Sequence, residues 1–110
     1  HGVIMKISCI IVLVTARDHA EAQSIAQGLL TDKLIACANI VDNVQSLFWW
    51  KKKVDQSREV LLILKTKKTL FRKICTKVKK LHSYDTPEII ALPIMDGSAD
   101  YLKWIRSSTC

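Results

Sequence analysis

Glycine and proline are scarce in this sequence, with three Gly and two Pro among 110 residues. This scarcity excludes collagen-like and low-complexity chains, and it leaves little room for a phosphate-binding glycine loop. No internal repeat is present, and no apolar run is long enough to span a bilayer. The remaining composition, 49% hydrophobic and 25% charged, is typical of a folded globular chain. At this length we predict one domain over residues 1–110.

Paired cysteine motifs are also absent. Four cysteines lie far apart in the sequence: Cys9, Cys37, Cys75 and Cys110. No C-x-x-C pair occurs, so neither a zinc ribbon nor a redox dithiol is indicated. Reduced thiols in a cytoplasmic protein fit this pattern best, because a chain with this much apolar content does not need disulfide bonds. The spacing alone does not exclude disulfides.

The first residues imitate a secretory signal, because Met5 and Lys6 precede the apolar run ISCIIVLVTA. We favour a buried first strand, since removing this run would leave the domain without a central strand. Residues 1–4 precede the methionine and are left out of the fold prediction. Residues 1–7 are expected to be disordered or foreign to the natural chain. We predict a cytoplasmic protein with no membrane partner.

Charge is distributed unevenly along the chain. The net charge is +7, and residues 51–110 carry 14 Lys and Arg against 6 Asp and Glu. Such an excess raises the possibility of nucleic-acid binding. RNA-recognition modules stack bases on aromatic residues of two strands, but the corresponding runs IIVLVT and EVLLILKT contain no aromatic residue. We therefore predict no nucleic-acid partner.

The first half of the chain predicts a strand, a helix and a second strand. Residues 8–16 form a β-branched apolar run, and Asp18 with Glu21 has the spacing of a helix N-terminal capping box. Apolar residues recur at helical spacing from 22 to 34, which places Glu21 on the outer, polar face. Residues 35–52 read as a long strand in which Asp42-Asn43 predicts a bulge.

The second half of the chain predicts a hairpin, a helix, a strand and a short helix. KKKVDQSRE is expected to reverse the chain into the strand EVLLILKT. Thr66 or Thr69 is expected to cap a helix whose apolar stripe runs from Leu70 to Leu81. A strand over EIIALPI and a helix over ADYLKWIRSS follow, and Pro93 should mark the end or the edge of that strand.

This order predicts an α+β fold of the ferredoxin-like βαββαβ class, with a long β-hairpin and a short C-terminal helix. The strands are apolar on both faces, so the sheet face without helices needs a cover. Residues 36–51 as one strand would span about 50 Å, whereas a domain of this length has a radius of gyration near 13 Å. The hairpin must therefore project, and its exposed aromatics Phe48, Trp49 and Trp50 predict a homo-oligomer interface.

Potential metal ligands gather in HSYDTPE, residues 82–88. His82, Asp85 and Glu88 offer imidazole and carboxylate donors within one turn, and Cys37 could add a thiolate. This set predicts a site for copper(II) or another divalent cation. The alternative is structural: His82 caps its helix, Asp85 forms an Asx-turn, and Glu88 pairs with a lysine.

Signals for catalysis are weak. Ser46, Ser83 and Ser98 lack a nucleophile-elbow context. Tyr84 beside His82 could serve acid–base chemistry, but the sequence pattern implies no substrate pocket. We predict that the protein is not an enzyme.

Several strings together resemble the CutA family of divalent-cation tolerance proteins over about residues 10–107. They are VTARDHAEAQSIAQGLL, KLIACANI, SLFWWKKKV, EVLLILKT, HSYDTPEIIALPI and GSADYLKWI. The resemblance implies one CutA-like domain, a ferredoxin-like subunit in a homotrimer, and association with copper and other divalent cations. It also implies a trimer architecture like that of the PII signalling proteins.

The family's His-Pro-Tyr-Glu-x-x-Glu pattern falls on residues 82–88. His82, Tyr84 and Glu88 keep the family's residue types, whereas Ser83 replaces the usual proline and Asp85 is a shorter carboxylate. These two departures loosen the turn and shorten the reach of one donor. Lysines at 51–53 also make the hairpin tip more basic than is usual in the family.

These observations together predict a homotrimeric, cytoplasmic protein that binds divalent cations and takes part in the tolerance of metal ions. Its predicted metal ligands are His82, Glu88, Asp85 and Cys37. One alternative is a PII-like signalling trimer that binds a small anionic ligand between subunits through Lys65, Lys67 and Tyr84. Another is a structural scaffold, in which the polar cluster only ties the subunits together.

Overall fold

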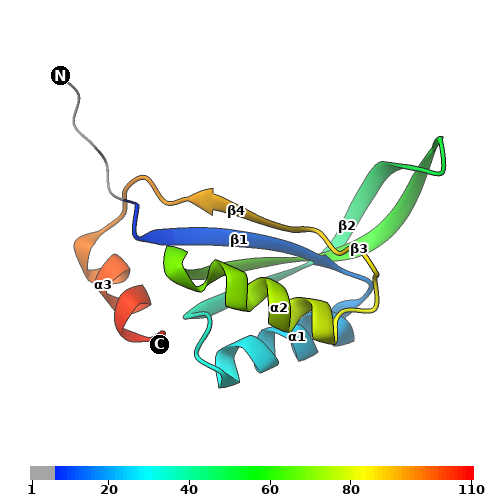
Figure 1. Cartoon of the computed structure of the whole chain (residues 1–110). Coiled ribbons are helices and arrows are strands. Elements are labelled where there is room, and N and C mark those ends of the chain that lie inside the picture. The colour runs from blue at the N-terminus through cyan, green and yellow to red at the C-terminus, as the bar shows by residue number, and fades with distance from the viewer. Residues whose placement is uncertain (1–6) are drawn as a thin grey trace.

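A computed structural model of the chain describes residues 7–110 (Figure 1). Its elements are β1 (Cys9–Ala16), α1 (His19–Thr31), β2 (Cys37–Trp50), β3 (Lys53–Lys67), the 3-10 helix η1 (Lys68–Leu70), α2 (Phe71–Leu81), β4 (Ile89–Pro93) and α3 (Ala99–Ser107). The predicted ferredoxin-like order with a C-terminal helix is confirmed. The expectation for residues 1–6 lies outside the described residues, whereas Ile7 is described and packs against the core.

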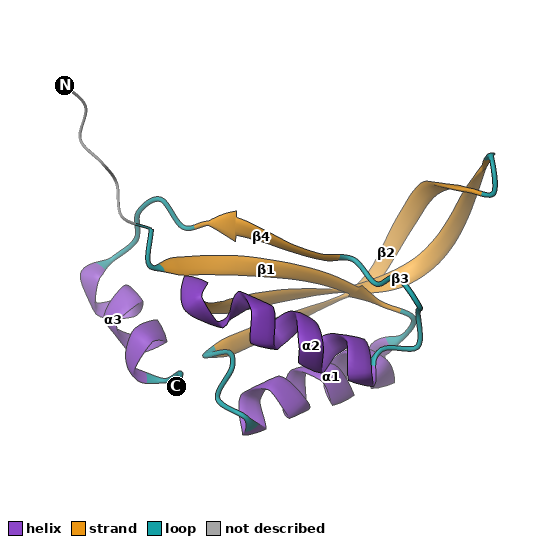
Figure 2. Cartoon of the chain, viewed as in Figure 1, coloured by secondary structure: helices purple, strands orange, loops and turns teal. Residues whose placement is uncertain are grey.

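The four strands form one antiparallel sheet in the order β2-β3-β1-β4 (Figure 2). The central strand β1 pairs with β3 on one side and with β4 on the other. Leu13 lies opposite Ile63 and Ile90, so these three side chains share one face of the sheet. Val12, Val14, Leu62 and Leu64 point to the other face and are fully buried.

Helices α1 and α2 cover that buried face, while the face that carries Leu13 is left without helices (Figure 1). In both helices the apolar residues recur at helical spacing and so form one apolar stripe. The core lies where these two stripes pack against the sheet. Its fully buried helix residues are Ala22, Ile25, Leu29, Ile74 and Val78. Ile90 and Leu92 on the open face remain 49% and 46% exposed. One chain therefore covers only one of the two apolar faces of its sheet.

The start of α1 follows the predicted cap in part. The Asp18 carboxylate accepts a hydrogen bond of 2.8 Å from the backbone N–H of Glu21. Glu21 in turn accepts from the N–H of Arg17, one residue before the cap, at 2.9 Å. The prediction that Glu21 lies on the solvent face is wrong, because Glu21 is only 9% exposed. Packing against the segment after α2 covers it.

The long hairpin of β2 and β3 projects from the body of the molecule (Figure 1). The predicted bulge is confirmed, since the register shifts between Val41 and Val44. The predicted reversal over residues 51–59 is too long: only Lys51 and Lys52 turn the chain, and β3 begins at Lys53. The radius of gyration, 15.1 Å, exceeds the value near 13 Å for a compact domain because of this projection.

The start of α2 differs from the sequence prediction. No side chain caps it, and the hydroxyl of Thr66 is buried and donates to the carbonyl oxygen of Leu34 at 2.6 Å. Thr66 is therefore a buried, hydrogen-bonded residue of β3 and does not cap a helix. Pro93 ends β4, an edge strand, as predicted.

Helix α3 packs against β1 and β3 at the end of the sheet where β1 begins (Figure 1). Ser98 caps it by accepting from the N–H of Tyr101, and Ile105 is its fully buried residue. Among the helices of residues 7–110, none has both the length and the apolarity of a transmembrane span.

Candidate functional site

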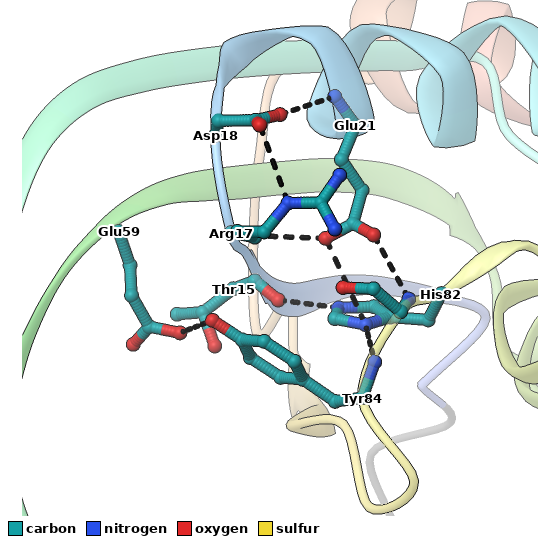
Figure 3. A network of polar contacts seen from close by, with 8 residues as sticks. Thr15, Arg17, Asp18, Glu21, Glu59, His82 and Tyr84 are labelled. Atoms are coloured by element: carbon teal, nitrogen blue, oxygen red, sulfur yellow. Dashed lines mark hydrogen bonds and ion pairs between the residues drawn. The ribbon is translucent and has the colours of Figure 1, made fainter.

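The segment HSYDTPE connects the end of α2 to β4, and its first three residues enter a network of polar contacts (Figure 3). His82 is the C-cap residue of α2. An extended backbone at His82 ends the helix and turns its side chain toward the sheet. The network therefore depends on where α2 stops.

The imidazole of His82 is fully buried, and both of its ring nitrogens are hydrogen bonded. Nε2 lies 2.7 Å from the carbonyl oxygen of Thr15, which can only accept, so Nε2 carries the proton. Nδ1 accepts from the backbone N–H of Tyr84 at 3.0 Å. The ring is thus held as one neutral tautomer with no lone pair left over.

Glu21 lies beside this ring and joins α1 to the same segment. One oxygen accepts from the N–H of Arg17 at 2.9 Å, and the other from the N–H of Ser83 at 2.8 Å. Its carboxylate is 3.9 Å from Nδ1 of His82. Burial disfavours the charged carboxylate, but the hydrogen bonds from Arg17 and Ser83 outweigh it and lower the pKa of Glu21. Glu21 therefore acts as a buried acceptor of backbone hydrogen bonds.

Tyr84 extends the network to β3. Its hydroxyl donates to the carboxylate of Glu59 at 2.8 Å, and Glu59 is only 8% exposed. Burial and the adjacent carboxylate raise the pKa of Tyr84 to about 12. The phenol ring of Tyr84 also lies beside the imidazole of His82, with ring centroids 4.7 Å apart.

The network does not provide a metal centre within one chain. Asp85 and Glu88 are exposed on the outside of the turn, whereas His82 points inward. Cys37 lies on β2, opposite Lys65 of β3. Among residues 7–110, no group of three or more His, Cys, Asp or Glu side chains is arranged to hold a metal ion. The structure thus supports the structural alternative for His82 and disagrees with its predicted role as a ligand.

The alternative anion-binding residues also lie apart within one chain. Lys65 donates to the side chain of Asn39 and is 4.0 Å from the sulfur of Cys37. Tyr84 is bonded to Glu59, and Lys67 lies eight positions further along β3, about 26 Å at 3.3 Å per residue. One chain therefore does not bring Lys67 and Tyr84 to the same cleft.

The aromatic residues near the hairpin tip are exposed, as predicted. Trp49 is 75% exposed, Trp50 58% and Phe48 38%. The nearby Leu47 and Val54 add to this apolar surface, with 66% and 61% exposed. The hairpin thus presents a projecting apolar arm in water.

Glu21, Glu59 and Thr15 belong to the network but were not among the predicted site residues. The spacing of Glu21 from Asp18 predicts only a helix cap and does not determine which groups its carboxylate contacts. One sequence signal marks Glu59 as a candidate site residue, because it is an acidic residue directly before the buried run of β3. Thr15 contributes only its carbonyl oxygen, which no sequence pattern marks.

Comparisons with known proteins identify relatives over almost the whole chain. The family described as CutA1 divalent ion tolerance protein matches residues 10–108. A divalent-cation tolerance protein CutA of Thermus thermophilus is 41% identical over 99 residues, which are 90% of this chain and 96% of that protein. The chloroplastic Protein CutA 1 of rice is 42% identical over 91% of this chain, but the chain spans only 56% of the rice protein.

Solved structures agree with these sequence matches. The structure of the divalent cation tolerance protein (Cut A1) from Thermus thermophilus superposes with a TM-score of 0.91 at 40% identity. The match covers 93% of this chain and 99% of that chain. The match therefore covers almost the whole of the fold described above.

Proposed function

Because the chain belongs to the CutA1 divalent ion tolerance family, we propose that it serves in the tolerance of divalent cations as a homotrimeric, cytoplasmic protein that binds them. The single observation that carries this proposal is the family match over residues 10–108, supported by 41% identity to a protein named for divalent-cation tolerance. Copper(II) is the cation we propose to test first, because among first-row divalent metals it binds most tightly to a given set of N, O or S donors.

Two exposed apolar regions support the homotrimer. The open sheet face carries the row Ile63, Leu13 and Ile90, and the hairpin carries Trp49 and Trp50. Contiguous apolar surface of this kind is rare on a monomer and marks an association surface. A second copy is the partner we propose, because it carries the same two apolar regions and their association would remove both from water. The proposed number of three subunits is taken from the family resemblance.

The dispersed donors indicate where a cation can bind. His82 has no free nitrogen, so we leave it out of the proposed ligand set and give it a structural role. Asp85 and Glu88 are exposed carboxylates, and Cys37 is a free thiol that is partly accessible. We propose that these groups bind a cation only in the assembled trimer, where donors of different subunits meet. Within residues 7–110 of one chain, no three such donors are grouped as a tight site needs.

Calorimetric titration with copper(II) chloride tests the cation proposal on the untagged protein. A chain that begins at Met5 serves as the reference, because the imidazole of His1 can bind copper independently of the proposed site. Saturable binding that the double variant Asp85→Asn, Glu88→Gln weakens at least tenfold would support the proposal. Asp100→Asn, which removes an exposed carboxylate on α3, is the control. The proposal fails if the reference chain shows no saturable binding.

Light scattering coupled to size-exclusion chromatography tests the assembly. The wild-type protein should elute with the mass of three chains, and Trp49→Glu with Trp50→Glu should reduce that mass, because two charges would enter the proposed interface. Trp104→Ala on α3, a 44% exposed indole away from the hairpin, should leave the mass unchanged. A monomeric wild type would contradict the proposal.

A further inference from the structure

A basic groove lies at the end of the sheet, far from the network around His82. It has a volume of about 1070 Å³ and is lined by the start of β1, the end of β3, the first residues of α2, the end of β4 and α3. Figure 1 shows these segments together at the end of the molecule opposite the hairpin. Ligand pockets in proteins have volumes of roughly 300–1,000 Å³, so this groove is large enough for a small molecule.

Positive charge dominates the groove. Four cationic side chains line it: Lys67, Lys68, Arg72 and Arg106. No carboxylate is among its lining residues. Within the described residues, none of the four has an acidic partner within 4.0 Å, because the ion pairs found there involve other cations. Helix α2 itself contains no acidic residue. These four charges are therefore not neutralised by the part of the chain that the structure describes.

The remaining lining of the groove is largely apolar. Ile10 of β1, Phe71 of α2, and Ala91 and Pro93 of β4 contribute to it, with Ile7 from the segment before β1. Phe71 is partly exposed although it packs against the core. A bare phosphate or sulfate would use only the cations and would leave this apolar surface in water. The lining thus favours a ligand with both an apolar body and a negative group.

We propose that this groove binds a small amphipathic anion, a molecule with an apolar body and one carboxylate or phosphate group. Arg72 and Arg106 bind the anionic group, because a guanidinium donates two parallel hydrogen bonds to such a group. Lys67 and Lys68 add positive charge, and Ile10, Phe71 and Pro93 pack against the apolar body. The groove contains none of Cys37, Asp85 or Glu88, so this proposal is independent of cation binding.

Calorimetry with four matched ligands tests the chemistry: octanoate, octyl phosphate, octanol and octylamine. The two anions should bind saturably and more weakly as salt is added, whereas octanol and octylamine should bind at least tenfold more weakly. The ratio of the two anion affinities distinguishes a carboxylate ligand from a phosphate ligand. Equal binding of octanol and octanoate would overturn the proposal, because the cations would then contribute nothing.

Variants test the location. Arg72→Ala and Arg106→Ala should each weaken anion binding about tenfold, because each removes charge-assisted hydrogen bonds. Lys80→Ala is the matched control, since Lys80 is an exposed cation of α2 outside the groove. All three side chains are exposed, so the fold should persist, and circular dichroism checks it. Lys68→Ala provides a third exposed variant of the groove and should also weaken anion binding.

Two results would place the ligand elsewhere. An equal loss of affinity in the Lys80→Ala variant would show that general surface charge attracts the anion. A fall in the mass of the assembly for Arg106→Ala, together with no binding of octanoate to the wild type, would show that a second copy of the chain fills the groove. Failure of the copper titration would leave the anion proposal unaffected, because the two use different residues.

Discussion

His82 Nε2 and the carbonyl oxygen of Thr15 are joined by a hydrogen bond of 2.7 Å, which fixes the end of α2 to the end of β1. The two residues are 67 positions apart in sequence. Because the imidazole is fully buried, water cannot replace either partner. The histidine that the sequence offers as a metal ligand is therefore a structural crosslink within the chain.

Removal of this side chain should destabilise the protein. His82→Ala leaves the Thr15 carbonyl and the Tyr84 N–H without their partner and creates a cavity, so the free energy of unfolding should fall by about 2–4 kcal/mol. Urea denaturation followed by circular dichroism measures the change. His19→Ala is the control: His19 is paired with Asp42 at the surface, and its loss should cost at most about 0.5 kcal/mol. A small effect of His82→Ala would contradict the crosslink.

Glu21 should make the stability depend on pH in the acid range. The pKa of Glu21 is lowered in the folded state from its usual value of 4.5. The unfolded chain thus binds a proton first as pH falls, and the stability that ionised Glu21 contributes is present above pH 4.5 and is lost below it. Urea unfolding between about pH 7 and 3 should show this loss, and Glu21→Gln should show a smaller one. An unchanged pH profile in the variant would contradict this role.

Tyr84 should make the stability depend on pH in the alkaline range. Its pKa is raised to about 12 in the folded protein, whereas an unfolded tyrosine titrates near 10. The folded state keeps the proton longer, so the contribution of Tyr84 is complete below pH 10 and is lost as pH rises to about 12. Tyr84→Phe should weaken that decline and should cost about 1–3 kcal/mol at neutral pH, because Glu59 loses its donor. Absorbance of tyrosinate during an alkaline titration checks the pKa directly.

The hairpin turn offers a gain in stability. Lys51 and Lys52 both have positive φ, 51° and 65°, in the left-handed region that lysine disfavours. Lys51→Asn with Lys52→Gly should stabilise the protein by about 1 kcal/mol, because Asn-Gly suits a two-residue turn with this geometry. Lys53→Gly is the control, since Lys53 already pairs within the strand and glycine should destabilise it. Thermal unfolding distinguishes the two variants, and destabilisation of both would contradict the assignment of the turn.

Local signals account for the parts of the fold that the sequence predicts. The β-branched run of β1, the cap at Asp18, the bulge at Asp42-Asn43 and the terminal position of Pro93 each depend on a few neighbouring residues. Backbone preferences of those residues are strong enough to decide the local conformation. The structure confirms all four.

Pairing across the sheet determines what the sequence does not reveal. Residues 53–58 look like part of a polar loop, yet each of them pairs with a residue between 45 and 50 of β2, and the ladder extends the strand to the tip. Lysines occupy the turn, so no glycine or asparagine marks it. The hydrogen bonds of β2 thus override the weak strand preference of VDQSRE.

The arrangement of the candidate site also depends on contacts between residues that are distant in sequence. His82, Asp85 and Glu88 are close in sequence, but a cap at the end of α2 turns the histidine inward and leaves both carboxylates outside. Glu21 contacts Ser83 across 62 positions, and no short motif encodes that distance. Donor types predict which atoms are available, whereas the tertiary fold decides which of them meet.

The segment after α2 also has a consequence for folding kinetics. Its three consecutive residues 82, 83 and 84 bind β1, α1 and β3, over separations of 67, 62 and 25 positions. Contacts over long separations close large loops, so they form late, after the sheet and both helices have come together. Substitutions in this segment should therefore accelerate unfolding while leaving the refolding rate nearly unchanged. The segment therefore determines the lifetime of the folded chain more than its rate of folding.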